Sequence, residues 1–178
     1  MKKVMLMFMF FVPMFIVAQN TTTEKTKYEN LLLKTGAVIS SINYYLGSVE
    51  FKSGYSDLTY RLSFSVSKVS VGNTNAKFLR ISHYELYSED NSEAYIEYSD
   101  VKQLDTAISQ LIQLSQNTIP EGATVQNTFM SADGLMLTSS GGKWQIRLER
   151  FTRDTMSFSD IAPLAEKIKE ALKKMDTI

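Results

Sequence analysis

Two segments of the chain, sixty residues apart, repeat one pattern of apolar residues. Residues 98–111 read YSDVKQLDTAISQL, and residues 158–171 read FSDIAPLAEKIKEA. Each begins with an aromatic residue and Ser-Asp, and then spaces its apolar residues as one face of a helix does. An isolated helix of this length is marginal in water, so each needs a partner to cover its apolar stripe. The matching positions are Val101, Leu104, Ile108, Leu111 and Ile112 in the first segment, and Ile161, Leu164, Ile168, Ala171 and Leu172 in the second.

Strand-like sequence precedes the first helix. Residues 59–66, TYRLSFSV, alternate between apolar and polar side chains, which is typical of an antiparallel strand with one buried face. Residues 37–47 and 48–54 predict two earlier strands, and two more follow before the helix. Val69 and Val71 continue out of phase with 59–66, which predicts a bulge near Ser67–Lys68.

The second half has the same order of elements. Strand-like stretches are separated by the turn signals Asp133–Gly134 and Gly141–Gly142, and a short strand near 155–158 leads into the last helix. The expected strands are 123–131, 135–139 and 143–150. Together the halves predict an α+β fold with two repeats, about 37–115 and about 123–175, packed into one domain over 28–178.

Each repeat is expected to hold about four antiparallel strands followed by an amphipathic helix. We expect each helix to be covered by its own sheet, and both helices to share one interior. Asp100 is expected to cap the first helix, with Gln103 in the capping-box position. A short helix is predicted over 28–34, anchored by its three leucines, Leu31, Leu32 and Leu33. Chance similarity between two helices of common spacing is the alternative to a repeat.

The first eighteen residues have the order of a secretory signal peptide. Lys2 and Lys3 precede an uncharged run from Val4 to Val17, and cleavage is expected between Ala18 and Gln19. A retained anchor is the alternative, but the run is shorter than the roughly 20 residues that a membrane span needs. We therefore expect an exported chain, periplasmic or extracellular, with a flexible leader over 19–27 and no membrane span after cleavage.

Composition argues against several chemistries. The chain has no cysteine, so it forms no disulfide, and a histidine-based triad or metal site would depend on its one histidine, His83. We interpret His83 as a strand residue that faces solvent or a polar neighbour, and the acidic stretch 88–93 as a solvated hairpin tip, not a calcium site. Gly141–Gly142 lacks the context of a phosphate-binding loop. We predict no catalytic residue, no metal site and no cofactor.

The tyrosines are unevenly distributed. All nine lie between Tyr28 and Tyr98. Aromatic rings beside arginine can stack on bases, sugars or a peptide, so we single out a speculative binding surface of four residues on neighbouring strands. They are Tyr84, Arg80, Tyr60 and Arg61. Ordinary cross-strand packing of aromatic residues is the alternative interpretation.

The duplicated strands-then-helix unit, with its Tyr/Phe-Ser-Asp helix entry, resembles the arrangement of Whirly proteins. The stretches LLLKTGAVIS, AYIEYSDVKQL and TVQNTFMSADGLML also resemble a group of secreted proteins of the Bacteroidetes type. The resemblance covers roughly Tyr28 to Met175 and implies the fold, but it implies no activity. Whirly proteins bind single-stranded DNA through basic surfaces. No Whirly-type basic motif occurs here, and the mature chain is slightly acidic without Lys2 and Lys3.

The sequence favours a non-catalytic ligand- or protein-binding module of the cell envelope. One alternative is an enzyme that acts on a glycan with two carboxylates facing each other across a cleft. The other alternative is a Whirly-like binder of single-stranded nucleic acid. That function is disfavoured because it calls for a continuous basic surface.

Overall fold

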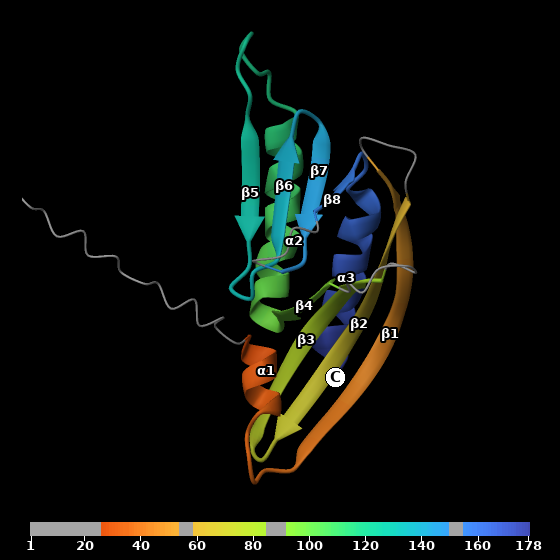
Figure 1. The fold of residues 1–178 in the computed structure, drawn as a ribbon, viewed down its shortest axis with the longest axis vertical. Helices are drawn as coiled ribbons and strands as arrows, with labels where there is room; N and C mark the ends of the chain where they lie inside the picture. Colours follow the sequence, from red (N-terminus) through yellow and green to blue (C-terminus); the bar gives the residue numbers. More distant parts are fainter. Residues whose placement is uncertain (1–25, 54–58, 85–91, 150–154) are drawn as a thin grey trace, which may run out of the picture.

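The computed structural model describes residues 26–53, 59–84, 92–149 and 155–178. The predicted signal peptide, its cleavage site at Ala18–Gln19 and most of the leader lie outside these residues. The described chain is α+β, with two four-stranded antiparallel sheets and three helices (Figure 1). The first sheet has the order β1 (Ile39–Lys52), β2 (Thr59–Val71), β3 (Thr74–His83) and β4 (Ser92–Glu97). The second has the order β5 (Gln126–Met130), β6 (Met136–Ser140), β7 (Lys143–Arg147) and β8 (Met156–Phe158).

Each sheet is followed by a long helix, which is consistent with two repeats. Helix α2 (Tyr98–Ser115) follows β4 and helix α3 (Ala162–Thr177) follows β8, while the short helix α1 (Lys27–Leu32) precedes the first sheet. The apolar residues that lie sixty positions apart in the two segments are buried alike. The buried pairs are Val101 and Ile161, Leu104 and Leu164, Ile108 and Ile168, and Leu111 and Ala171.

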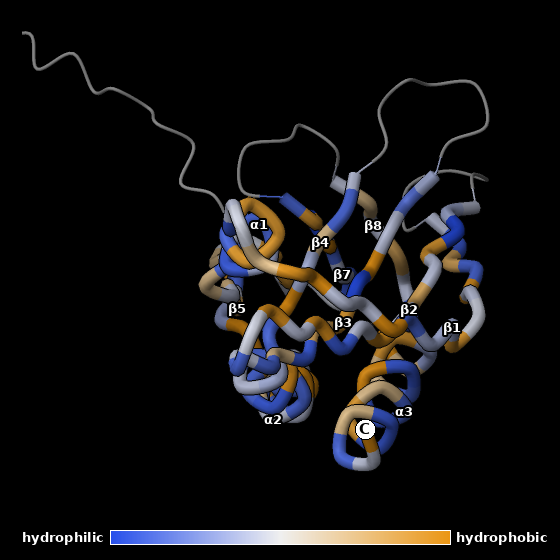
Figure 2. Tube along the Cα trace, turned by 90° about the horizontal axis from the view of Figure 1, so that it is seen from below, coloured by the Kyte–Doolittle hydropathy of each residue, from blue (hydrophilic) through white to orange (hydrophobic). Residues whose placement is uncertain are grey.

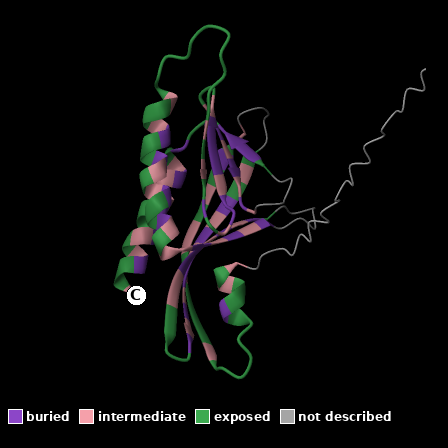
Figure 3. Ribbon diagram, turned by 90° about the vertical axis from the view of Figure 1, so that its left-hand side faces the viewer, coloured by how far each residue is buried: buried purple, intermediate pink, exposed green. Residues whose placement is uncertain are grey.

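The two long helices lie side by side on the same side of the sheets (Figures 2 and 3). Their partners differ from the prediction that each helix is covered by its own sheet. Helix α3 follows the second sheet but runs against β1, β2 and β3 of the first, and α2 contacts β3 and β4 as well as β5 and β6. The halves are therefore interleaved, so one interior serves both sheets.

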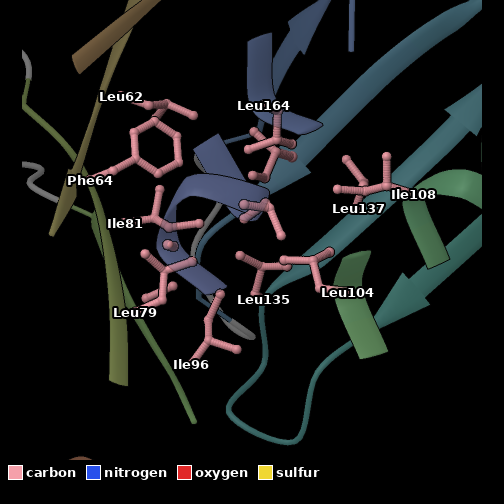
Figure 4. Close-up of a cluster of buried hydrophobic side chains, with 14 of the residues drawn as sticks. Leu62, Phe64, Leu79, Ile81, Ile96, Leu104, Ile108, Leu135, Leu137 and Leu164 are labelled. Atoms are coloured by element: carbon pink, nitrogen blue, oxygen red, sulfur yellow. The ribbon is translucent and has the colours of Figure 1, made fainter. Parts of the chain in front are cut away.

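This interior is one cluster of buried side chains. Figure 4 shows Leu62, Phe64 and Ile81 of the first sheet on one side, Leu164 of α3 in the middle, and Leu137 of the second sheet opposite. The sheets also meet directly at their ends. Ser53 forms a bridge with Phe158, and the rings of Phe51 and Phe158 lie 4.9 Å apart.

Strand β1 corrects the prediction of two strands over 37–47 and 48–54. It is one strand of 14 residues, bent where the register against β2 shifts between Tyr45 and Gly47. Leu46 is the extra residue of this bulge, and Gly47 supports it with a φ of 94°, which L side chains rarely adopt. The Lys167 ammonium of α3 donates a hydrogen bond to the Leu46 carbonyl at 2.5 Å.

The predicted bulge near Ser67–Lys68 was wrong, because β2 pairs through this point without a shift. The apolar pattern changes phase because the buried face changes. The first half of β2 buries Leu62, Phe64 and Val66 against the helices, whereas Val69 and Val71 point to the opposite, outer face. There α1 covers them through Leu31. Of the three leucines predicted to anchor this helix, Leu32 at its end and Leu33 just beyond it are exposed.

The start of α2 differs from the predicted capping box. The helix begins at Tyr98, and its N-cap Glu97 makes no side-chain capping bond. Asp100 lies within the first turn, and its carboxylate accepts a hydrogen bond from the Ala132 backbone at 3.1 Å. Asp160 does bond the first helical residue of α3, Ala162, at 2.9 Å. Among the described residues, no helix combines the length and hydropathy of a membrane span.

The bulge gives a first testable expectation. Gly47→Ala should lower the free energy of unfolding by about 1 to 2 kcal/mol, because alanine pays the steric cost of a positive φ. The space itself is adequate, since an added Cβ would lie 3.7 Å from the Lys167 ammonium. Urea denaturation measures the change. Ser48→Ala, one residue further along the same strand, is the control and should change stability by less than about 0.5 kcal/mol; equal effects would contradict a strained bulge.

Candidate ligand-binding site

The outer face of the first sheet carries polar side chains across all four strands. Because paired residues of neighbouring strands share a face, the register places Tyr45 beside Ser65, Ser65 beside Arg80, and Arg80 beside Tyr95. This row crosses the sheet at right angles to the strands. A second row, beginning with Asn43 and Ser67, lies on the side nearer α1. Further along, the face becomes apolar where α1 covers it.

These rows form the floor of a pocket of about 290 Å³. Helix α1 supplies one wall through Tyr28, whose ring stacks on that of Tyr95 with centroids 3.8 Å apart and planes 8° from parallel. The Tyr28 ring also packs on that of Phe78 in a T-shaped contact, with centroids 5.2 Å apart. We call this the outer-face pocket. Its lining residues are Tyr28, Asn43, Tyr45, Ser65, Ser67, Arg80 and Tyr95.

An ion pair fixes the charged end of the pocket. The guanidinium of Arg80 donates two hydrogen bonds to the Glu93 carboxylate, one of them from Nε at 3.2 Å. This bonding raises the pKa of Arg80 above its usual value. The Tyr95 hydroxyl donates to the same carboxylate at 3.0 Å. Burial, together with the Glu93 charge, raises the pKa of Tyr95 well above the ordinary tyrosine value.

Neutral groups make up the rest of the floor. The Ser67 hydroxyl donates to the Asn43 side-chain oxygen at 2.6 Å, which orients the amide so that its NH₂ group points away from this contact. The Tyr45 hydroxyl is 2.9 Å from the Ser48 hydroxyl. Asn43 and Tyr45 lie on the exposed face of β1, the edge strand, whereas Ser65 and Ser67 lie deeper on the central strand β2. The pocket therefore offers fixed hydrogen-bonding groups around the rings of three tyrosines.

The structure separates the four residues of the speculative binding surface. Arg80 lines the outer-face pocket. Arg61 shares that face of the sheet but is exposed and paired with Glu50. Tyr60 packs against the core, with its ring 5.9 Å from that of His83, and Tyr84 is exposed beyond the end of β3.

Sequence reasoning missed most of the lining. The sequence predicts the serines of 59–66 only as the polar side of a strand, Ser67 as part of a bulge, and Tyr28 as part of a short helix. The signal that could have found the pocket is the pairing of that serine row with Arg80 and Tyr95. This pairing needs the strand register, and the alternating pattern is equally satisfied by registers that differ by two residues.

Other candidates have less support. His83 lies in β3, so its assignment to a strand is confirmed, but it is buried and does not face solvent; the ring of Tyr60 lies 5.9 Å from its own. The acidic stretch 88–93 lies largely outside the described residues, and within the described ranges no cluster of three metal-ligating side chains occurs. A second hollow of about 350 Å³ lies between α2 and β5, lined by Lys102, Thr106 and Phe129 among others, and is more open to solvent.

The structure defines the chain as an α+β protein with two four-stranded antiparallel sheets and a polar pocket on the outer face of the first. Comparison with known proteins adds no closer relationship. No protein-family model, no curated protein and no solved structure matches the chain.

The raised pKa of Tyr95 predicts that the wild type and Tyr95→Phe differ in how their stability depends on alkaline pH. In the unfolded chain Tyr95 loses its proton near pH 10, whereas in the folded chain it keeps the proton to higher pH. The contribution of Tyr95 is therefore complete below about pH 10 and is lost as the pH rises further. We expect the free energy of unfolding of Tyr95→Phe to fall less steeply than that of the wild type between about pH 10 and 12. Urea denaturation of both proteins across this pH range measures the two slopes. Parallel plots of the free energy of unfolding against pH would contradict a raised pKa for Tyr95.

Proposed function

We propose that this protein is a non-catalytic ligand-binding module of the cell envelope and that the outer-face pocket is its ligand site. The observation that carries the proposal is the row from Tyr45 to Tyr95, which lines up hydrogen-bonding side chains across four strands on a face that the main core does not use. Pockets with a few convergent polar groups and a perturbed pKa are the usual places for ligands.

The N-terminal sequence supports placing the module outside the cytoplasm. The order of Lys2 and Lys3, the uncharged run and Ala18–Gln19 is that of a signal peptide. The periplasm and the extracellular space are both compatible with it. The proposal includes a Whirly-like origin of the two units by duplication, which the equal strand order of both sheets supports.

The lining favours binding over the two alternatives. A glycan-acting enzyme needs two facing carboxylates, whereas the seven lining residues include none. A nucleic-acid binder needs unpaired basic groups, whereas the one cation in the lining, Arg80, is held by Glu93. These side chains support a binding role, because they present hydrogen-bonding groups and aromatic rings to a ligand.

Nuclear magnetic resonance of the mature 19–178 chain tests the proposal. Addition of the small-molecule fraction of an envelope extract should shift the side-chain amide signals of Asn43 and the backbone signals of Ser65 and Ser67. Asn43→Ala should remove the effect, while Thr106→Ala, in the hollow between α2 and β5, should leave it unchanged. Shifts around Thr106 with none at Ser65 and Ser67, or no shift at all, would contradict the proposal.

A further inference from the structure

The groups that the outer-face pocket offers to a ligand are almost all uncharged. Asn43 has a side-chain amide oriented by Ser67, and Ser65 and Tyr45 carry hydroxyls that can each donate and accept. Arg80 is the one charged lining residue, and the two bonds to Glu93 compensate its charge. An anion would have to compete with this carboxylate, and a cation would meet the guanidinium. The pocket therefore gives little advantage to a charged ligand.

The aromatic groups differ in what they leave accessible. The rings of Tyr28 and Tyr95 stack, so one face of each is covered by the other. The guanidinium carbon of Arg80 lies 5.9 Å from the centre of the Tyr95 ring. Tyr45 is 69% exposed and stands at the open edge of the pocket on β1. Its ring can pack on an apolar ligand face while the neighbouring hydroxyl and amide groups bond to the ligand rim.

The direction of the pocket argues against an extended peptide. A peptide that adds to a sheet pairs with a free strand edge, whereas the pocket runs across the strands. The middle of its floor is formed by β2 and β3, the two central strands, whose backbone groups are committed to their neighbours on both sides. Only side chains are available to a ligand there. A volume of about 290 Å³ is at the small end for ligand pockets and suits one or two rings.

We propose that the outer-face pocket binds a neutral saccharide, packed on the ring of Tyr45 and hydrogen-bonded to Asn43 and Ser65. A sugar ring combines an apolar face with a rim of hydroxyls that donate and accept, and this matches the lining group by group. This inference rests on the proposed function, because it names the ligand class of the same site.

A glycan array carrying neutral, acidic and sulfated sugars, probed with the mature 19–178 chain, tests the ligand class. We expect signals from neutral glycans, and calorimetry with the best of them gives its Kd. Tyr45→Ala and Asn43→Ala should each weaken this Kd by about tenfold or more, since each removes a principal contact. Tyr84→Ala is the matched control, because Tyr84 is equally exposed at 67% but lies outside the pocket, and it should change the Kd by less than about twofold.

Ionic strength separates a neutral ligand from an anion at Arg80. The Kd should stay nearly constant between roughly 0.05 M and 0.5 M salt, since no charge is neutralised on binding. Signals confined to acidic or sulfated glycans, or an equal loss in Tyr84→Ala, would overturn the saccharide assignment. An empty array, with the extract still shifting Asn43, would overturn it and leave the binding function standing. An extract without effect would remove both.

Discussion

Leu104→Ala and Leu164→Ala will each lower the free energy of unfolding by about 2 to 5 kcal/mol. Both side chains are almost completely buried, at 1% and 0% exposure, within the same cluster. A Leu→Ala change in such surroundings loses the burial of the removed carbons and leaves a cavity that the neighbours fill only in part. Urea denaturation followed by circular dichroism measures the loss for each variant.

Leu114→Ala provides the matched control for these two variants. Leu114 lies on α2 with Leu104 but is 45% exposed, so its replacement should cost less than about 1 kcal/mol. Because both helices and both sheets contribute to one buried cluster, each core variant should also unfold in one cooperative step. Two separate transitions, with Leu104→Ala affecting one and Leu164→Ala the other, would contradict a shared interior.

The period of the sequence was enough to predict most of this interior. Buried positions recur every three or four residues in α2 and α3 and every second residue in β2, so the helix pairs at an offset of sixty could be named from spacing alone. The choice of sheet for each helix could not be read this way. An apolar stripe reports that Leu164 is covered, but does not identify which sheet covers it.

The errors in the strands share one physical cause. Sequence alternation assumes that a strand buries one face along its whole length, whereas β2 buries its inner face first and its outer face after Ser67. The change comes from α1, a helix too short to be predicted as a cover for a sheet. Likewise Gly47 looked like a break between strands, although it supports a bulge within one.

Of the four residues singled out from the sequence, only Arg80 lines the outer-face pocket. The ring beside it is that of Tyr95, across the ladder, and Tyr28 stacks on Tyr95 from a helix far away in sequence. Tyr60 follows the period of the core face of β2, so its burial against the interior was implied by Leu62 and Phe64. Cross-strand register and the docking of α1 are tertiary facts, and they decide which side chains meet in the pocket.

Phe78→Ala will lower the free energy of unfolding by about 3 to 5 kcal/mol and will release α1 from the sheet. Phe78 is completely buried on the outer face, in a cluster with Leu31, Val69 and Val71 that is separate from the main core. Phenylalanine-to-alanine changes at such sites have costs of this size. A helix of six residues cannot persist alone in water, so α1 depends on this cluster for its structure.

Hydrogen exchange locates the effect of this change. The amides of Asn30 and Leu33, which bond to the carbonyls of Thr26 and Glu29 in α1, should exchange at least about tenfold faster in Phe78→Ala. Leu33→Ala is the control within the same segment, because Leu33 is 55% exposed. It should leave the exchange of Asn30 within about twofold of the wild type.

The release of α1 should also open the outer-face pocket, because α1 holds Tyr28 against Tyr95. Without that wall, the Tyr95 ring gains solvent and its pKa should fall back toward the ordinary tyrosine value, since burial is the largest cause of its rise. An ultraviolet titration of Phe78→Ala, compared with Phe78→Ala/Tyr95→Phe, isolates this phenol. If α1 keeps its protection and the Tyr95 titration does not move, the outer cluster does not hold the helix, and the pocket wall must depend on other contacts, such as the ion pair between Lys27 and Glu97.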